Sequence, residues 1–226
     1  MPAANDGATG GVTAAHARQE VLETALAMSR RGLSPGRSGN VSRRFRDGML
    51  ITPSGMAYDA IQPGDIVFVA SDSRVAKGQR KPSSEWLFHL AAYRARADRS
   101  AVVHTHSMHA TVLACAGKSI PAFHYMVAVA GGKNIPLVPY ATFGTKALAR
   151  HVAKGLKKRD ACLMANHGQI AIGDTGAKAL DLAAEVEILA EQYFKVLCLG
   201  KPILLADAEM KTVLARFKSY GQNAQT

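Results

Sequence analysis

The chain has 226 residues, of which 48% are hydrophobic and 20% charged, so it can bury a sizeable core and is not intrinsically disordered. No run of 18 apolar residues occurs and the N-terminal segment lacks a signal-peptide pattern, so neither a membrane-spanning helix nor export is predicted. The 28 Lys and Arg exceed the 17 Asp and Glu, and the resulting net charge of +11 attracts polyanions or small phosphorylated metabolites.

The N-terminal half alternates between helical and extended patterns. Residues 1–12 are small and polar and are expected to form a flexible tail. Because no linker divides the rest of the chain, residues 13–226 are predicted to form one domain. Apolar side chains at helical spacing predict helices, and short apolar runs between turn residues predict strands. These are helices at 14–31, 84–97 and 108–116, and strands at 49–51, 66–69 and 101–106.

The C-terminal half continues the alternation, with predicted helices at 146–156, 177–199 and 208–220 and strands at 161–165 and 169–172. The link between those two strands is too short for a parallel crossover, so they are antiparallel if they are adjacent. No G-x-G-x-x-G or phosphate-loop motif occurs. The predicted fold is therefore an α/β layered sandwich, with a mainly antiparallel or mixed central sheet flanked by helices.

The cysteine and aromatic content restricts compartment and partners. Cys115, Cys162 and Cys198 are odd in number and far apart, which indicates reduced core thiols in the cytoplasm rather than a disulfide framework. Aromatic residues make up only 6% of the chain and the basic residues are scattered, so neither a nucleic acid nor a membrane is expected as a partner. The excess positive charge is more simply explained as steering of phosphorylated substrates.

His104 and His106 form the strongest local motif, at the end of the strand predicted over 101–106. Side chains two residues apart on a strand point to the same face, so the two imidazoles converge. They can occupy two positions of a tetrahedral metal such as zinc, and leave room for a third protein ligand and a substrate. The alternative is a pair of surface histidines at a strand end.

Further polar residues lie in turns near the apolar runs. Asn166-His167-Gly168 lies between two predicted strands, and the glycine permits a positive φ and close backbone approach. His167 is either a third metal ligand or a turn histidine bonded to backbone. Glu85 follows Ser83 and Ser84 at a predicted helix start, where hydroxyls and free amides can hold a phosphate and a carboxylate can act as general base. The turns Ser38-Gly39-Asn40 and 52–55 offer similar groups, although each alone is an ordinary turn.

An ordered set of motifs covers nearly the whole chain after the tail, and by these motifs the sequence resembles the class II aldolase/adducin family, in particular its L-fuculose-1-phosphate aldolase branch. The motifs are SGNVS (38–42), DGMLITPSG (47–55), PSSEWLFH (82–89), AVVHTH (101–106), PAFHYMVAVAGG (121–132), PYATFGT (139–145), NHG (166–168) and FKSYG (217–221).

The resemblance implies a zinc site and assigns roles to individual residues. The zinc ligands would be His104, His106, His167 and Glu85, and Glu85 would also act as general acid/base. The phosphate of dihydroxyacetone phosphate would be bound by Gly39, Asn40, Ser54, Gly55, Ser83 and Ser84. Tyr125 of a neighbouring subunit would deliver a proton to the aldehyde oxygen, and Phe143 and Tyr220 would line the aldehyde side. A homotetramer with active sites at its subunit interfaces is the assembly implied.

The reaction so implied is reversible cleavage of a ketose 1-phosphate to dihydroxyacetone phosphate and a short aldehyde, such as lactaldehyde. The alternatives are an aldolase for 5-deoxyribulose or 5-methylthioribulose 1-phosphate, a decarboxylase of sugar-acid phosphates, and a non-catalytic scaffold like adducin. Related epimerases have Asp where this chain has Glu85, and adducin heads lack the full metal set. Two features depart from the family pattern. Asn166 replaces a histidine, which is expected to change the surroundings of His167. The segment after Tyr220 differs in length and charge, which is expected to change the preference for the aldehyde.

Overall fold

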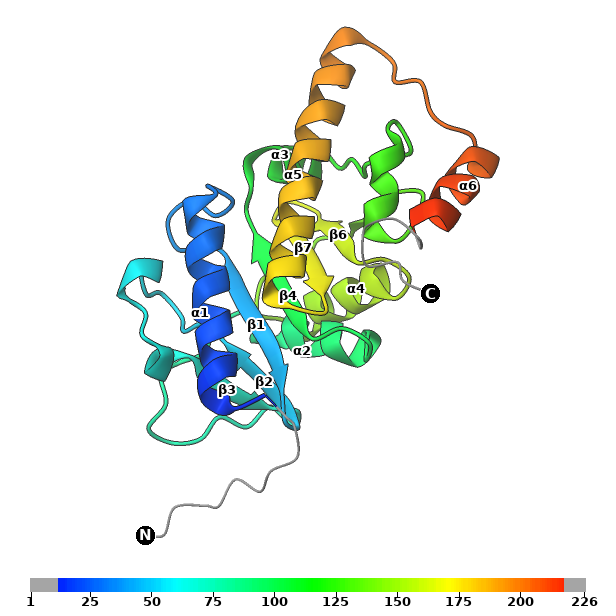
Figure 1. Ribbon diagram of the computed structural model, residues 1–226. Coiled ribbons are helices and arrows are strands. Elements are labelled where there is room, and N and C mark those ends of the chain that lie inside the picture. Colours follow the sequence, from blue (N-terminus) through cyan, green and yellow to red (C-terminus); the bar gives the residue numbers. More distant parts are fainter. Residues whose placement is uncertain (1–11, 218–226) are drawn as a thin grey trace.

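The computed structural model describes residues 12–217, which form a seven-stranded mixed sheet between two layers of helices (Figure 1). The strands lie in the order β3-β2-β1-β4-β7-β6-β5, and neighbours are antiparallel except for the parallel pair β5 and β6. They are β1 (Asn40–Phe45), β2 (Gly48–Ile51), β3 (Val67–Ala70), β4 (Ala101–Thr105), β5 (Leu137–Val138), β6 (Ala161–Met164) and β7 (Gly168–Gly173). The predicted layered α/β sandwich and its antiparallel β6–β7 pair are confirmed.

The helices bury the two faces of this sheet. One layer consists of α1 (Ala14–Arg30), α3 (Met108–Cys115) and α5 (Gly176–Leu199), and the other of α2 (Trp86–Ala95) and α4 (Lys146–Leu156). Because side chains alternate along a strand, Val103 of β4 packs with the first layer and Val102 with the second. Each strand of the centre is therefore apolar on both faces.

The last helix stands apart from these layers. α6 (Asp207–Phe217) packs on the 3-10 helix η3 (Tyr125–Ala130) and is joined to the end of α5 by an extended segment, as Figure 1 shows. Two shorter 3-10 helices, η1 (Tyr58–Ala60) and η2 (Pro63–Asp65), precede β3. Residues 1–11 of the predicted tail and 218–220 of the predicted last helix lie outside the described residues.

β1 is absent from the predicted strands, although it lies between β2 and β4. Its start resembles a turn and its end carries two arginines, which conceal the extended pattern. The structure accommodates both charges at the edge of the core. The Arg44 guanidinium lies 4.8 Å from the centre of the Tyr93 ring and donates to the Tyr93 carbonyl, and Arg43 donates to the Glu20 carboxylate.

The remaining elements differ from prediction in small ways. The ends of most predicted helices and strands are correct to within one residue, but the helix expected from residue 84 begins at Trp86, and the two-residue β5 was too short to detect. The assignment of all three cysteines to the core is wrong, because only Cys162 is buried while Cys115 and Cys198 are exposed near helix ends. Within residues 12–217, no helix combines the length and apolar character needed to cross a membrane.

Candidate active site and metal centre

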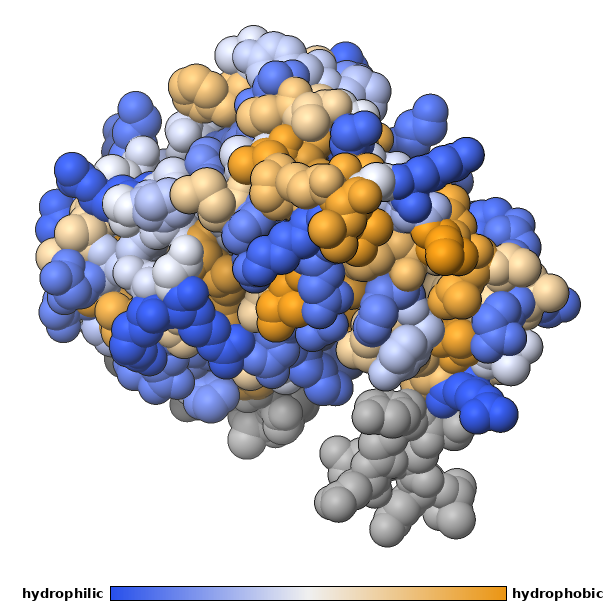
Figure 2. All heavy atoms as spheres, turned by 90° about the horizontal axis from the view of Figure 1, so that it is seen from above, coloured by the Kyte–Doolittle hydropathy of each residue, from blue (hydrophilic) through white to orange (hydrophobic). Residues whose placement is uncertain are grey.

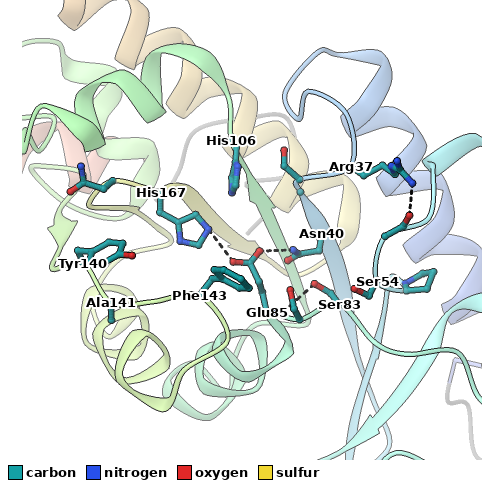
Figure 3. Close-up of a pocket in the computed structure, with 16 residues that line it drawn as sticks. Arg37, Asn40, Ser54, Ser83, Glu85, His106, Tyr140, Ala141, Phe143 and His167 are labelled. Atoms are coloured by element: carbon teal, nitrogen blue, oxygen red, sulfur yellow. Dashed lines mark hydrogen bonds and ion pairs between the residues drawn. The ribbon is translucent and has the colours of Figure 1, made fainter.

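Four of the predicted site residues converge at the end of β4. His104 lies in β4 and His106 just beyond it, His167 lies in the turn between β6 and β7, and Glu85 immediately precedes α2. One potential ligand atom from each lies within 4.8 Å of all the others. Three segments of the chain thus place three imidazoles and one carboxylate around a single point. Figure 3 shows His106, His167 and Glu85 of this cluster.

The spacing of these groups leaves room for a cation at their centre. His104 Nε2 lies 3.0 Å from His106 Nε2 and 3.2 Å from Glu85 Oε2, and His167 Nε2 lies 3.0 Å from Glu85 Oε1. Two facing imidazole nitrogens repel each other unless a proton or a cation lies between them. Glu85 Oε1 is buried and makes no hydrogen bond to the described residues. Three nitrogens and one oxygen form a donor set that fits a divalent transition metal.

Hydrogen bonding fixes which nitrogen of His104 faces this centre. His104 is fully buried, and its Nδ1 lies 2.7 Å from the carbonyl oxygen of Gln169 on the neighbouring strand β7. A carbonyl oxygen only accepts, so Nδ1 carries a hydrogen and Nε2 is the nitrogen that faces the cluster. Such a backbone contact orients a metal-binding imidazole and fixes its tautomer.

A buried chain of hydrogen bonds positions Glu85. The Asn40 amide donates to Glu85 Oε2 at 2.9 Å, and the Asn40 carbonyl oxygen accepts from His89 Nε2 at 2.5 Å. His89 Nδ1 must therefore accept from the Ser42 hydroxyl, 2.7 Å away, and Ser42 can accept in turn from the Tyr93 hydroxyl at 2.8 Å. Burial lowers the pKa of His89 to about 3, so the ring stays neutral in this chain.

The electrostatics of the cluster favour ligand-ready protonation states. Burial alone would raise the pKa of Glu85, but its electrostatic interactions with His104 and His167 hold that pKa well below its ordinary value. Burial, together with the neighbouring His104 and His167, lowers the pKa of His106 to about 3. Near neutral pH, Glu85 is thus an anion and the His106 imidazole is neutral, which are the forms that bind metals.

The turn that carries His167 differs from the prediction in one detail. The positive φ of 53° belongs to Asn166 and not to Gly168. Gly168 is needed for a close approach instead, because a Cβ there would lie 2.4 Å from the carbonyl oxygen of Thr105. Asparagine is among the few residues that adopt the left-handed conformation readily, so Asn166 lets the chain reverse and directs His167 inward.

A cavity of about 450 Å³ opens beside the cluster. Glu85, His106 and His167 form one wall, and Figure 3 shows them directed toward one another. Phe143, which was predicted to contact the aldehyde, also lines the cavity. The lining further includes every residue predicted to bind phosphate, namely Gly39, Asn40, Ser54, Gly55, Ser83 and Ser84.

Sequence reasoning missed several residues that line this cavity and one that supports it. Arg37, Tyr140 and Asn166 are among those that contribute to its wall. Arg37 directly precedes the predicted Ser38-Gly39-Asn40 turn, so its position was a usable signal. His89 is buried on α2 and holds Asn40. Nothing in the sequence pattern distinguishes it from an ordinary helical histidine.

Of the two predicted tyrosines, Tyr125 does not line this cavity. Tyr125 is 50% exposed and lines a separate hollow between η3 and α6, together with His124 and Phe217. Tyr220 lies outside the described residues. In the described part of the chain, the cavity is therefore lined by three of the four predicted metal ligands and by the residues predicted to bind phosphate, but not by Tyr125.

The comparisons with known proteins identify the family to which this fold belongs. The Class II Aldolase and Adducin N-terminal domain family matches residues 19–194, and the chain belongs to this family. A 5-methylthioribulose-1-phosphate/5-deoxyribulose-1-phosphate aldolase from Rhodospirillum rubrum is 50% identical over 208 residues, which cover 92% of this chain and 94% of the relative. The L-fuculose phosphate aldolase of Escherichia coli K12 is 48% identical over 204 residues, covering 90% and 94%.

A solved structure gives the same result. An L-fuculose 1-phosphate aldolase superposes with a TM-score of 0.85 at 40% identity, and the match covers 89% of this chain and 96% of that chain. The chain is therefore a class II aldolase, an enzyme of the lyase class, and the resemblance predicted from its motifs is confirmed.

Metal binding to the four-residue cluster is directly measurable. Titration of the metal-free protein with a divalent transition metal is expected to show one site per chain. The variant His106→Ala should weaken binding by more than the roughly 10- to 100-fold typical of losing an outer hydrogen-bond partner. His151→Ala removes a half-buried histidine outside the cluster and should leave the affinity unchanged. Equal affinities in the two variants would contradict a metal site at His106.

Proposed function

We propose that this chain is a zinc-dependent aldolase that cleaves a ketose 1-phosphate reversibly to dihydroxyacetone phosphate and a short aldehyde. The observation that supports this most directly is the buried cluster of three imidazoles and Glu85, which opens onto a cavity walled by small hydroxyl and glycine residues. The cluster of imidazoles and Glu85 suits a metal that binds a hydroxyketone. The hydroxyl and glycine residues suit the phosphate of the same substrate.

Zinc is the proposed metal because of the chemistry of the donors. Three histidine nitrogens with one carboxylate oxygen match a tetrahedral zinc site, and a ligand that can be displaced leaves a position for substrate. The proposed ligands are His104, His106, His167 and Glu85. When bound, the ion would polarise the hydroxyl and carbonyl oxygens of the substrate and stabilise the negative charge that develops on them.

Glu85 is the proposed general acid and base. In the condensation direction it accepts a proton from the hydroxymethyl carbon of dihydroxyacetone phosphate, and that carbon then bonds to the aldehyde carbonyl carbon. Tyr125 donates a proton to the aldehyde oxygen, and cleavage is the reverse. The Asn40 amide donates to Glu85 Oε2 at 2.9 Å. This hydrogen bond keeps the carboxylate oriented when it changes from binding the metal to accepting the proton.

The residues proposed to bind phosphate have hydrogen-bond donors that no other group of the described residues occupies. The Ser83 hydroxyl oxygen accepts from the Glu85 N–H at 3.3 Å, so its own hydrogen remains free to donate. One amide hydrogen of Asn40 binds Glu85 and the other can reach a ligand. Ser54, Ser84 and the glycines at 39 and 55 complete the proposed set, where the absence of side chains lets backbone approach the phosphate.

The aldehyde half of the substrate distinguishes two candidates. Relatives of similar identity act on L-fuculose phosphate and on 5-methylthioribulose or 5-deoxyribulose 1-phosphate, and both reactions use the same dihydroxyacetone-phosphate half. We propose the fuculose-phosphate type, with the second aldolase activity as the alternative, and a sugar-acid phosphate decarboxylase after it. Phe143 is the residue proposed to contact the aldehyde within this chain, together with Tyr220.

A coupled assay for dihydroxyacetone phosphate tests this function. We expect release from fuculose 1-phosphate, 5-deoxyribulose 1-phosphate or 5-methylthioribulose 1-phosphate, with the highest kcat/KM identifying the substrate. A chelator should abolish the release and added zinc should restore it. Glu85→Gln should lower kcat about 10²- to 10⁴-fold, the usual contribution of a general acid or base. No release from any of the three by fully metal-loaded protein would rule out the aldolase reaction proposed.

The separation of Tyr125 from the cavity supports an assembly with sites between subunits. Tyr125 lies in its own hollow against α6, so a neighbouring copy has to supply it. Exposed apolar side chains include Met108 and Val112 of α3 and Ile188 of α5, and Figure 2 shows apolar groups reaching the surface seen from above. Such exposure is typical of subunit interfaces. We therefore propose a homotetramer.

We also propose that the protein is cytoplasmic, because its three cysteines are unpaired.

Mixing two inactive variants tests the shared site. If His106 and Tyr125 of one site come from different chains of a head-to-tail ring, co-expressed His106→Ala and Tyr125→Phe subunits form wild-type sites at about one position in four. Activity should then recover to about a quarter of the wild-type value. Mixing His106→Ala with Glu85→Gln is the matched control and should recover none, because both changes affect residues contributed by the same chain. Failure of the first pair to recover would contradict the interface site.

A further inference from the structure

Arg37 lies at the mouth of the cavity on the turn that precedes β1. Its Nη1 donates to the carbonyl oxygen of Gly55 at 2.7 Å, which holds the guanidinium against the wall where phosphate binding is proposed (Figure 3). The side chain is exposed, so a ligand that enters the cavity can reach it. The remaining N–H groups of its planar fork are left to bind a second partner.

The charge of Arg37 is not neutralised within the described chain. No carboxylate of residues 12–217 pairs with it, whereas Arg96 and Arg99 both pair with Asp160. Arg37 is also the sole lysine or arginine among the described residues that line the cavity. Arg37 is held by the backbone carbonyl of Gly55 and pairs with no carboxylate of the described residues. Its positive charge is therefore available to a ligand that enters the cavity.

The proposed substrate requires such a charge. A phosphate monoester carries about −1.5 to −2 charges at pH 7, and every other residue assigned to its wall offers only neutral hydroxyls or amides. Arg37 supplies a full positive charge at this wall, and its guanidinium is held there by the Gly55 carbonyl.

We propose that Arg37 is a phosphate ligand of this enzyme and determines its selectivity for phosphorylated over unphosphorylated ketoses. The inference rests on the proposed aldolase function and names a residue that the family motifs do not assign. One edge of the fork stays on the Gly55 carbonyl, and the other binds phosphate oxygens through charge-assisted hydrogen bonds. The contact with Gly55 also keeps that carbonyl oxygen from facing the phosphate directly.

The test compares Arg37→Gln and Arg37→Lys with Arg150→Gln. Arg150 is exposed on α4 and does not line the cavity, so its variant controls for the change in net charge. Arg37→Gln should raise the KM for the ketose 1-phosphate about 10- to 100-fold, the range expected for a hydrogen bond to a charged group. It should lower the selectivity ratio for phosphorylated over unphosphorylated ketose by the same factor. Arg37→Lys should lose less, because it keeps the charge.

A second measurement separates this proposal from the aldolase function. Inorganic phosphate, titrated calorimetrically into the metal-loaded protein, should bind about 10- to 100-fold more weakly to Arg37→Gln than to the wild type or Arg150→Gln. This result would stand even if none of the three ketose phosphates were cleaved. Unchanged phosphate binding and KM in Arg37→Gln, with aldolase activity intact, would overturn the role of Arg37 alone. Equal losses in the lysine and glutamine variants would also contradict a role for its charge.

Discussion

Glu85 is almost wholly removed from solvent, and its negative charge has to be balanced within the same small volume. The Nε2 atoms of His104 and His167 lie 3.2 Å and 3.0 Å from its oxygens, and His106 Nε2 lies 3.0 Å from His104 Nε2. A buried carboxylate is costly unless it is paired and hydrogen-bonded. The metal ion proposed for this point would balance the charge of Glu85 and satisfy the surrounding nitrogen atoms together. It would therefore link the burial of the site to its chemistry.

The sheet explains how such a cluster can be built with little freedom. β4 lies at the centre, with Asn40 of β1 opposite His104 on one side and Gln169 of β7 opposite Thr105 on the other. Asn40 binds Glu85 and the Gln169 carbonyl binds His104 Nδ1, so strand register fixes two of the four ligands. Groups held by packed strands keep their geometry during the reaction, and this preorganisation is what general acid/base and electrostatic catalysis need.

The local motifs predicted most residues of the candidate site, but fewer of the residues that hold them in place. The two-residue spacing of His104 and His106 is a direct consequence of strand geometry, and the order of motifs brought in Glu85 and His167. β1 was missed because Arg43 and Arg44 interrupt its apolar pattern, and their partners Glu20 and Tyr93 are distant in sequence. The role of His89 depends on a three-dimensional chain of hydrogen bonds that no local pattern encodes. The position of Tyr125 likewise depends on how η3 packs against α6.

Exchange of hydrogen for deuterium at the hydroxymethyl carbon of dihydroxyacetone phosphate tests the central claim most directly. The metal-loaded protein in deuterated water, without aldehyde, should exchange one of the two hydrogens on that carbon, as followed by proton NMR. Glu85→Gln, checked for retained metal, should slow the exchange about 10²- to 10⁴-fold because it lacks the base. Absence of exchange with the wild type, or equal rates in the two proteins at equal metal content, would contradict the assignment of Glu85 as the group that moves the carbon-bound proton.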